Sequence, residues 1–439
     1  MADQETSPGD TPRGRAGDSA GDEPRFSPQQ YRLGYNPHYQ GVPFTGFASI
    51  SPETDLSALN LNWREQDLPE RVRTKHVHRL HPYLGKFIPQ LAEVFLRKFA
   101  PSRVCDPFVG SGTTLVEANA LGIEATGCDL SPFNCLLSKV KTDAYDLKVL
   151  AREIHDILMR TEVDIGGTIF GAARSDGVSA RDGYLTTWFA ERALRQLLTY
   201  LRLIPDYIYQ DVLKVILSRA ARSARLTPHH QLDFPDKPQR EPYYCHKHFR
   251  TCQPTDDALK FLRRYSLDTL SRISEFAKSR TSSAVHVMCG DARAVEFPPH
   301  DLILTSPPYV GLIDYHEQHR YAYELLSLLP NAFESIGWKE MDIKANEPLE
   351  IGAAAKGVSN GAKAAYVEGI ISVLRNVKRA LARDGAAVII VADRRGLYEH
   401  IAEKAGFRMH DLLERHVNRR TGRRSGDFFE QIMIWRPKR

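Results

Sequence analysis

The feature of the sequence that most constrains the fold is an alternation of strand, glycine turn, helix and strand between residues 103 and 129. RVCDPFV predicts a short buried strand, GSGTT a turn, LVEANALG a helix, and IEATGCDL a second strand that ends on an acid. Strands that alternate with helices in this way are typical of a parallel sheet. Four more strand patterns follow after residue 280, namely AVHVMCGD, DLILTSPPY, GAAVIIVAD and FFEQIMIW. We therefore expect an α/β fold.

The strand patterns are interrupted by a long stretch in which helical periodicity dominates, as in WFAERALRQLLTYLRLI and DDALKFLRRYSLDTLSRISEFAK. The first residues are instead rich in Gly, Pro, Asp and Ser, a composition that buries too little apolar surface to fold. We expect four regions: a disordered tail at 1–28, the first part of the α/β domain at 29–145, a largely helical insert at 146–280, and the second part of the α/β domain at 281–439.

The composition of the 439 residues is that of an ordinary globular protein, with 42% hydrophobic residues. The chain has no apolar run long enough to span a membrane and no secretory h-region at its N-terminus. Its six cysteines form no disulfide framework. These features predict a cytoplasmic protein without a membrane partner.

The net charge of +5 says little about nucleic acid, but the basic residues are clustered. One cluster contains Arg415, Arg419, Arg420, Arg423 and Arg424, and another contains Arg219, Arg222 and Arg225. Local clusters of this kind can contact phosphates. Each cluster can equally be a solvated face.

The glycine turn has the features of a nucleoside site. Gly110 and Gly112 allow a ligand to approach the backbone closely, and Asp129 follows at a distance suited to accepting hydrogen bonds from ribose hydroxyls. The turn lacks the third glycine of a dinucleotide site. Asp106, just before it, suits the cationic S-adenosylmethionine better than a pyrophosphate. These residues favour a methyl donor over NAD.

A second turn, Ser306-Pro307-Pro308-Tyr309, closes the DLILT strand. The prolines remove two backbone donors and leave carbonyl groups free. Ser306 and the Pro307 carbonyl could accept hydrogen bonds from an exocyclic amino group, so that its lone pair points at the methyl group. Tyr309 could stack on a base turned out of the duplex. The turn contains no cysteine, which argues against methylation of cytosine C5, because that reaction needs a thiolate.

These motifs together resemble those of the DNA amino-methyltransferase family, of the TSPPY type. DPFVGSGTT is similar to the family's donor motif, GCDLSPFN to its ribose-binding strand end, and TSPPY to its catalytic motif; GDARAVEF and HRLHPYLGKFIPQLAEVFL resemble further motifs near the donor. The matches span about residues 75–140 and 285–325. The resemblance implies catalytic residues Ser306, Pro307, Pro308 and Tyr309, and donor-binding residues Lys86, Phe87, Asp106, Phe108, Gly110, Gly112, Thr113, Thr114, Asp129 and Asp291.

The resemblance also implies a seven-stranded, mostly parallel sheet flanked by helices and the cofactor S-adenosylmethionine. Because the donor motifs precede the catalytic motif, the insert at 146–280 would select the sequence of a double-stranded DNA substrate. It could instead be a structural cap or an oligomer interface. A cognate restriction endonuclease or a defence-system subunit is a candidate partner.

The choice of base and substrate leaves alternatives. A serine at the start of the catalytic motif favours cytosine N4 over adenine N6 as the target. An RNA amino-methyltransferase is the nearest rival function, and a non-catalytic DNA-binding scaffold is a more distant one.

Three further segments carry weaker signals. Cys245, His248 and Cys252 are ligand types that zinc prefers, with His229 and His230 upstream, but they do not form a CxxC pair. The working expectation is therefore no metal, and a polar or phosphate-contacting loop. Residues 314–321 could line the base pocket or start a helix. The Gly- and Ala-rich stretch 351–366 is expected to be mobile and to become ordered on DNA.

Overall fold

The computed structural model describes residues 45–63, 67–167, 183–233, 235–311, 313–338, 345–417 and 429–438. The tail predicted at 1–28 and most of the arginine cluster around residue 420 lie outside these residues. No helix in the described part of the chain combines the length and the apolar character needed to cross a membrane.

Seven strands form one sheet in the order β5-β2-β1-β6-β7-β9-β8. Their bounds are β1 Arg103–Asp106, β2 Glu124–Asp129, β5 Val285–Cys289, β6 His300–Thr305, β7 Leu381–Val391, β8 Phe407–His416 and β9 Phe429–Pro437. The pairs among the first five strands of this order are parallel, and β9 is antiparallel to both of its neighbours. The expected α/β fold with a seven-stranded, mostly parallel sheet is confirmed.

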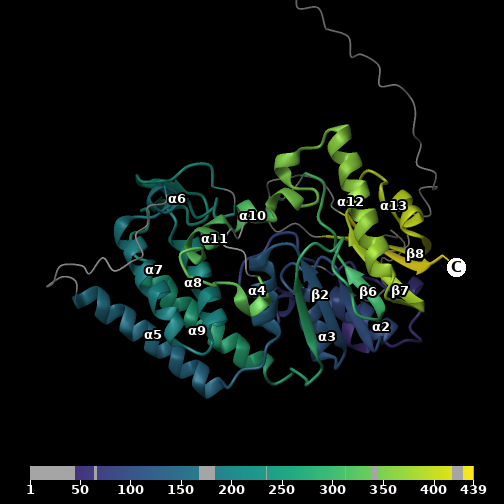
Figure 1. The fold of residues 1–439 in the computed structure, drawn as a ribbon, viewed down its shortest axis with the longest axis horizontal. Helices are drawn as coiled ribbons and strands as arrows, with labels where there is room; N and C mark the ends of the chain where they lie inside the picture. The colour runs from purple at the N-terminus through teal and green to yellow at the C-terminus, as the bar shows by residue number, and fades with distance from the viewer. Residues whose placement is uncertain are drawn as a thin grey trace, which may run out of the picture.

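Helices cover both faces of this sheet. Alternate residues of β7 point to opposite sides, so that Val388 joins one apolar cluster and Ile389 the other. The first cluster includes α2 (Pro89–Phe99) and α3 (Thr113–Ala120), and the second includes α12 (Asn360–Lys378) and α13 (Tyr398–Ala405). Figure 1 shows α12 and α13 together at one end of the molecule.

A third apolar cluster lies among helices at the opposite end of the molecule, where α5, α7, α8 and α9 gather beside α4 (Figure 1). The helices concerned are α4 Pro132–Thr142, α5 Leu147–Gly167, α7 Glu191–Leu203, α8 Gln210–Ala224, α9 Leu259–Phe276 and α11 Arg320–Leu326. Strand β5 follows α9, so residues 147–276 are inserted between two parallel strands of the sheet.

The remaining elements are short. They are the helices α1 Glu70–Arg73, α6 Gly183–Trp188 and α10 Tyr315–Gln318, the 3-10 turns η2 Phe47–Ser49, η3 Leu56–Ala58, η4 Ile204–Asp206, η5 Glu334–Ile336, η6 Glu347–Leu349 and η7 Ala354–Lys356, and a separate two-stranded sheet of β3 Tyr243–Cys245 and β4 Arg250–Cys252.

The expectation that 351–366 is mobile is wrong for its second half. Ser359 caps α12 by accepting a hydrogen bond from the backbone N–H of Ala362, and the helix begins at Asn360. Tyr366 is buried, and its hydroxyl donates to the carbonyl of Pro308 (2.8 Å). The second half of this stretch is thus the capped and partly buried start of a helix.

Four arginines of the two predicted clusters lie among the described residues, and each has a partner within the fold. Arg415 is buried and pairs with Glu430 at 3.0 Å. Arg219 pairs with Asp268 at 2.5 Å, and Arg222 with Asp233. Arg225 is also buried; it donates to the carbonyl of Leu232 (2.6 Å), and its guanidinium lies over the ring of Tyr321. Arg219, Arg225 and Arg415 form neither a phosphate-binding patch nor a solvated face, because they are buried and their charges are used inside the fold, whereas Arg222 stays partly exposed.

Candidate active site

An open pocket lies at the carboxyl ends of the central strands and encloses about 840 Å³ out to its mouth. It sits where the strand order reverses, with β2 and β5 on one side of β1 and with β6 and β7 on the other. Ligands of open α/β sheets bind at such a switch point, because the loops leave the two central strands in opposite directions.

The glycine turn after β1 forms one wall of the pocket. Gly110 has a φ of +49°, and a Cβ there would lie 2.8 Å from the hydroxyl of Tyr83. Gly112 has a φ of +80° at the start of α3, and a Cβ there would lie 3.2 Å from the Cα of Ser138. Side chains at either position would be strained and would displace their neighbours. The wall can take this shape only with glycine.

Asp129, at the end of β2, lies in the pocket wall behind this turn. One carboxylate oxygen accepts a hydrogen bond from the backbone N–H of Gly110 (2.9 Å). The other accepts from the N–H of Ser131 (2.9 Å) and the amide of Asn134 (3.0 Å). Burial raises the pKa of Asp129, while these donors oppose the rise. The carboxylate is thus fixed in position at the pocket.

Asp106 is buried, and it lies behind the pocket wall and not in it. Its carboxylate accepts hydrogen bonds from the hydroxyls of Thr114 (2.7 Å) and Thr305 (2.6 Å) and from the N–H of Phe108 (3.1 Å). Burial raises its pKa to about 6 despite these donors. The side chain therefore ties together the glycine turn, α3 and the end of β6.

The Ser306–Tyr309 turn meets the pocket from β6. Ser306 and Pro308 line the pocket, whereas Pro307 is buried behind them. Tyr309 packs against the apolar cluster beneath α12, and burial raises its pKa. Its ring is not part of the pocket wall in this conformation.

The segment just before α2, which belongs to the N-terminal motif, forms another part of the pocket wall. Phe87 is buried in the wall. Lys86 also lines the pocket, but its ammonium group donates to the carbonyl of His78 (2.7 Å). Burial lowers the pKa of Lys86 to about 8, and Arg272 and Arg79 lower it further.

Asp291, after β5, also lies in the pocket wall. Burial acts to raise its pKa, but the guanidinium of Arg293, 2.7 Å away, outweighs burial and lowers it. A negative charge is thus kept at this side of the pocket.

The structure brings most of the predicted site residues together. Those in the wall are Lys86, Phe87, Phe108, Gly110, Thr113, Asp129, Asp291, Ser306 and Pro308. Those close behind it are Asp106, Gly112, Thr114, Pro307 and Tyr309, which shape the turns without lining the pocket.

Sequence reasoning missed Tyr83 and Glu350 in the pocket wall, whereas Tyr315 and His316 fall in the stretch 314–321 that it considered. Tyr83 stacks on Tyr315, with ring centroids 5.5 Å apart. His316 donates or accepts through Nδ1 at 2.9 Å from Glu350, and its buried Nε2 has no hydrogen-bond partner among the described residues. Tyr315 and His316 line the pocket, while Asp314 caps α10 and Tyr321 is buried among helices. Residues 314–321 thus serve both of the roles considered for them. The sequence signal for these residues was the run of polar and aromatic residues that follows the Ser306–Tyr309 turn.

A second group of chemically active side chains lies in the insert. Cys245, His248 and Cys252 come together there, and His229 joins them from a separate segment. The ligand atoms of these four residues all lie within 4.8 Å of one another.

Comparisons with known proteins agree with the motifs. The chain is 35% identical over 444 aligned positions to the Type II methyltransferase M.MjaII of Methanocaldococcus jannaschii, and the match covers 83% of this chain and 81% of that protein. It is 41% identical over 85 residues to the Type II methyltransferase M.MvaI of Kocuria varians, which is 18% of this chain and 19% of that protein. No protein-family model matches the chain.

Solved structures that resemble the chain do so weakly. TrmN from Thermus thermophilus has a TM-score of 0.30 at 13% identity, covering 81% of this chain and 50% of that one. The rRNA methyltransferase aviRa from Streptomyces viridochromogenes has a TM-score of 0.29 at 12% identity, covering 81% of this chain and 88% of that one. The family is decided by the sequence relatives: the chain belongs to the type II DNA methyltransferases, and its resemblance to the DNA amino-methyltransferase family is confirmed.

Proposed function

We propose that this DNA methyltransferase transfers the methyl group of S-adenosylmethionine to the exocyclic amino nitrogen of a base in double-stranded DNA, with cytosine N4 favoured over adenine N6. The observation that carries the proposal is one shared pocket. Gly110 and Asp129 from the glycine turn line the same cavity as Ser306 and Pro308 from the catalytic turn. A donor and an acceptor nitrogen can therefore meet in it.

The residues present fit the donor. Gly110 lines the pocket without a side chain and at a positive φ, which suits close contact between a ligand and the backbone. Asp129 is a fixed acceptor for ribose hydroxyls, and Asp291 supplies a negative charge across the pocket. Phe87 and Phe108 give the wall an apolar part for an adenine ring. When bound, the donor supplies an electrophilic methyl group on its sulfonium.

Ser306 and the adjoining backbone position the acceptor. An exocyclic amino nitrogen is a poor nucleophile, because its lone pair is delocalised into the ring. Hydrogen bonds from its N–H groups to Ser306 Oγ and the Pro307 carbonyl direct the lone pair at the methyl carbon. Alignment and electrostatic stabilisation of this kind account for much of an enzymatic rate. The base must leave the duplex to enter the pocket.

After transfer, the amino nitrogen carries one proton too many. His316 lines the pocket, its Nδ1 is held at 2.9 Å from the Glu350 carboxylate, and its Nε2 is without a partner among the described residues. An imidazole whose other nitrogen is held by a carboxylate is a suitable proton acceptor. We assign His316 the removal of this proton.

Mass spectrometry of nucleosides from treated DNA tests the proposal. The purified chain is incubated with labelled S-adenosylmethionine and unmethylated genomic DNA, and we expect labelled N4-methylcytosine. Ser306→Ala should lose the product, while Ser327→Ala, an exposed serine on the surface, should keep it. Labelled N6-methyladenine would overturn the choice of base. Labelled C5-methylcytosine, or label in RNA alone, would overturn the reaction.

We further propose that the insert selects the DNA sequence. The hairpin of β3 and β4 supports this role, because its connection carries Lys247, β4 begins at Arg250, and Phe249 between them is 81% exposed. Removing one side chain that binds a phosphate lowers the salt slope of DNA binding by about one. We expect Lys247→Ala to do so without changing donor affinity. An unchanged slope would contradict an interaction of this hairpin with DNA. A cognate endonuclease is the corresponding partner in a restriction–modification pair.

A further inference from the structure

The segment from residue 227 to residue 257, between α8 and α9, has almost no apolar support. None of its described residues belongs to the three apolar clusters of the molecule. Its only sheet consists of two strands of three residues each, β3 and β4. A two-stranded hairpin of this size is marginal in water, so the segment needs another source of stability.

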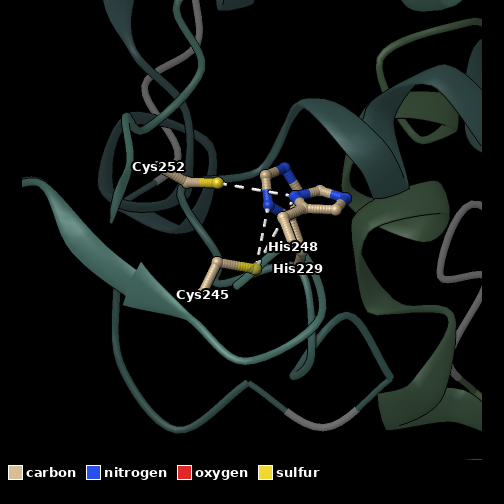
Figure 2. Close-up of side chains that lie close together, drawn as sticks. All are labelled: His229, Cys245, His248 and Cys252. Carbon is tan, nitrogen blue, oxygen red and sulfur yellow. Dashed lines mark hydrogen bonds between the residues drawn. The ribbon is translucent and has the colours of Figure 1, made fainter. Parts of the chain in front are cut away.

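Two cysteines and two histidines converge inside this segment (Figure 2). Cys245 ends β3, Cys252 ends β4, His248 lies in the connection, and His229 comes from the chain that follows α8. Both cysteines are buried, with 0% and 7% of their surface exposed. The nearby Phe249 adopts a φ of +53°, a conformation unusual for a residue other than glycine. This turn directs the His248 ring and the sulfur atoms of Cys245 and Cys252 toward one another (Figure 2).

The distances between the ligand atoms of these side chains are close to those expected around a tetrahedral zinc ion. His248 Nδ1 lies 3.4 Å from Cys252 Sγ and 3.7 Å from Cys245 Sγ, and His229 Nδ1 lies 3.7 Å from Cys245 Sγ. In a tetrahedral zinc site, with about 2.3 Å to each sulfur and about 2.0 Å to each nitrogen, sulfur and nitrogen ligands lie roughly 3.6 Å apart. A thiol is a weak hydrogen-bond donor, so thiol–imidazole contacts alone supply little stability.

We propose that His229, Cys245, His248 and Cys252 bind one structural Zn²⁺ ion. Two thiolates balance the charge of the ion, and four protein ligands close the tetrahedron, as in structural rather than catalytic zinc sites. The ion joins the hairpin to the end of α8 and thereby holds residues 227–257 in place. This proposal does not depend on the proposed methyl transfer.

Tyr243 offers a test of His229 as a zinc ligand. Its hydroxyl lies 2.9 Å from His229 Nδ1, so the hydroxyl and the ion compete for the same lone pair. Tyr243→Phe removes the competitor and leaves all four ligands in place. Zinc affinity should therefore be unchanged or higher in this variant.

Metal analysis of the full-length protein tests the site. We expect about one zinc per chain after purification without added metal, in line with the closed coordination. Cys245→Ser and Cys252→Ser should each lower zinc affinity by more than about 100-fold, beyond the effect typical of residues outside the ligand shell. His246→Ala, an exposed neighbour outside the cluster, is the matched control and should keep the zinc.

Cobalt substitution gives a readout that does not depend on the variants. Co²⁺ in the chelator-treated protein should show thiolate-to-metal charge transfer and the strong visible bands of a tetrahedral site. Failure of the protein to bind Zn²⁺ or Co²⁺, or equal binding by wild type and a Cys245→Ser/Cys252→Ser double variant, would overturn the proposal. Donor binding and methyl transfer are measured in parallel, so loss of the proposed function would be recognised separately.

Discussion

The pocket at the sheet and the Cys/His segment at 227–257 are stabilised in opposite ways. The turns of the pocket rest on strands whose side chains fill two apolar clusters, and the carboxylate of Asp106 receives three hydrogen bonds beneath them. The segment 227–257 contributes no described residue to those clusters and gathers sulfur and nitrogen ligands instead. The chemical site therefore depends on burial, whereas the segment depends on a bound ion.

The largest expected effect is on the segment alone. A chelator that removes zinc should expose 227–257 to proteases, because structural zinc supplies about 10–16 kcal/mol of apparent folding free energy in small domains. Donor affinity, measured by calorimetry on the same sample, should change less than about twofold, which is under roughly 0.4 kcal/mol. Equal loss of donor binding and protease resistance would show that the two regions are not independent.

The next effect is confined to the pocket. Ser306→Ala should lower turnover by about 10²–10³-fold, or roughly 3–4 kcal/mol, because one positioning group of the transition state is removed. Affinity for S-adenosylmethionine should stay the same, as should the zinc content. Single-turnover kinetics with Ser327→Ala as the control measures this. A variant that turns over normally would remove Ser306 from the mechanism.

A pH dependence follows from Asp106. Its pKa in the folded protein is about 6, above the ordinary value of 3.8, so the native state holds the proton more tightly than the unfolded chain. Between about pH 4 and pH 6 the unfolded chain binds fewer protons, and stability falls as the pH rises through this window. Two pKa units correspond to about 3 kcal/mol.

Asp106→Asn isolates this contribution from other titrating groups. The variant keeps one of the two acceptor oxygens and replaces the other by an NH2 donor, so it should be less stable by about 1–3 kcal/mol at low pH. Urea unfolding at pH 4 and at pH 7 should show the wild type losing more stability across this range than the variant. Parallel curves for the two proteins would contradict the raised pKa.

The smallest effect concerns Arg222, which pairs with Asp233 in the segment. Asp233 is 39% exposed, so the pair should contribute only about 0.5–1 kcal/mol. Arg222→Gln should leave the salt dependence of DNA binding unchanged, in contrast to Lys247→Ala. If the salt slope instead falls by about one, Arg222 contacts a phosphate and not Asp233 alone.

The central strands were predictable because each is a short apolar run that ends on a turn or an acid. Strand β8 was not, because polar residues such as Arg408, Asp411 and Glu414 interrupt its apolar ones at the sheet edge. The start of α12 was missed for a different reason. Its Gly- and Ala-rich sequence lacks an apolar period, and the cap at Ser359 and the burial of Tyr366 decide its structure.

The motif residues of the pocket were predictable, since each lies in a short continuous motif of the sequence. The hydrogen bonds of Asp106 were not, because its partner Thr305 is 199 residues away in the chain. His229 joins the Cys/His group from 16 residues before Cys245 and only through folding of the intervening chain. Sequence patterns thus predict which residues belong to a site, whereas the contacts that hold those residues in position depend on the tertiary structure.

The pairing of β1 with β6 also has a consequence during synthesis. A ribosome that makes about 5–20 residues per second needs roughly 10–40 s to progress from Asp106 to Thr305. Over that time one edge of β1 has no neighbour, while the helices of the insert emerge and can pack locally. During this interval the unpaired edge of β1 is exposed, and the nascent chain can associate with other chains through it. Chaperones should therefore bind the nascent chain most strongly after β1 has been synthesised and before β6 has been.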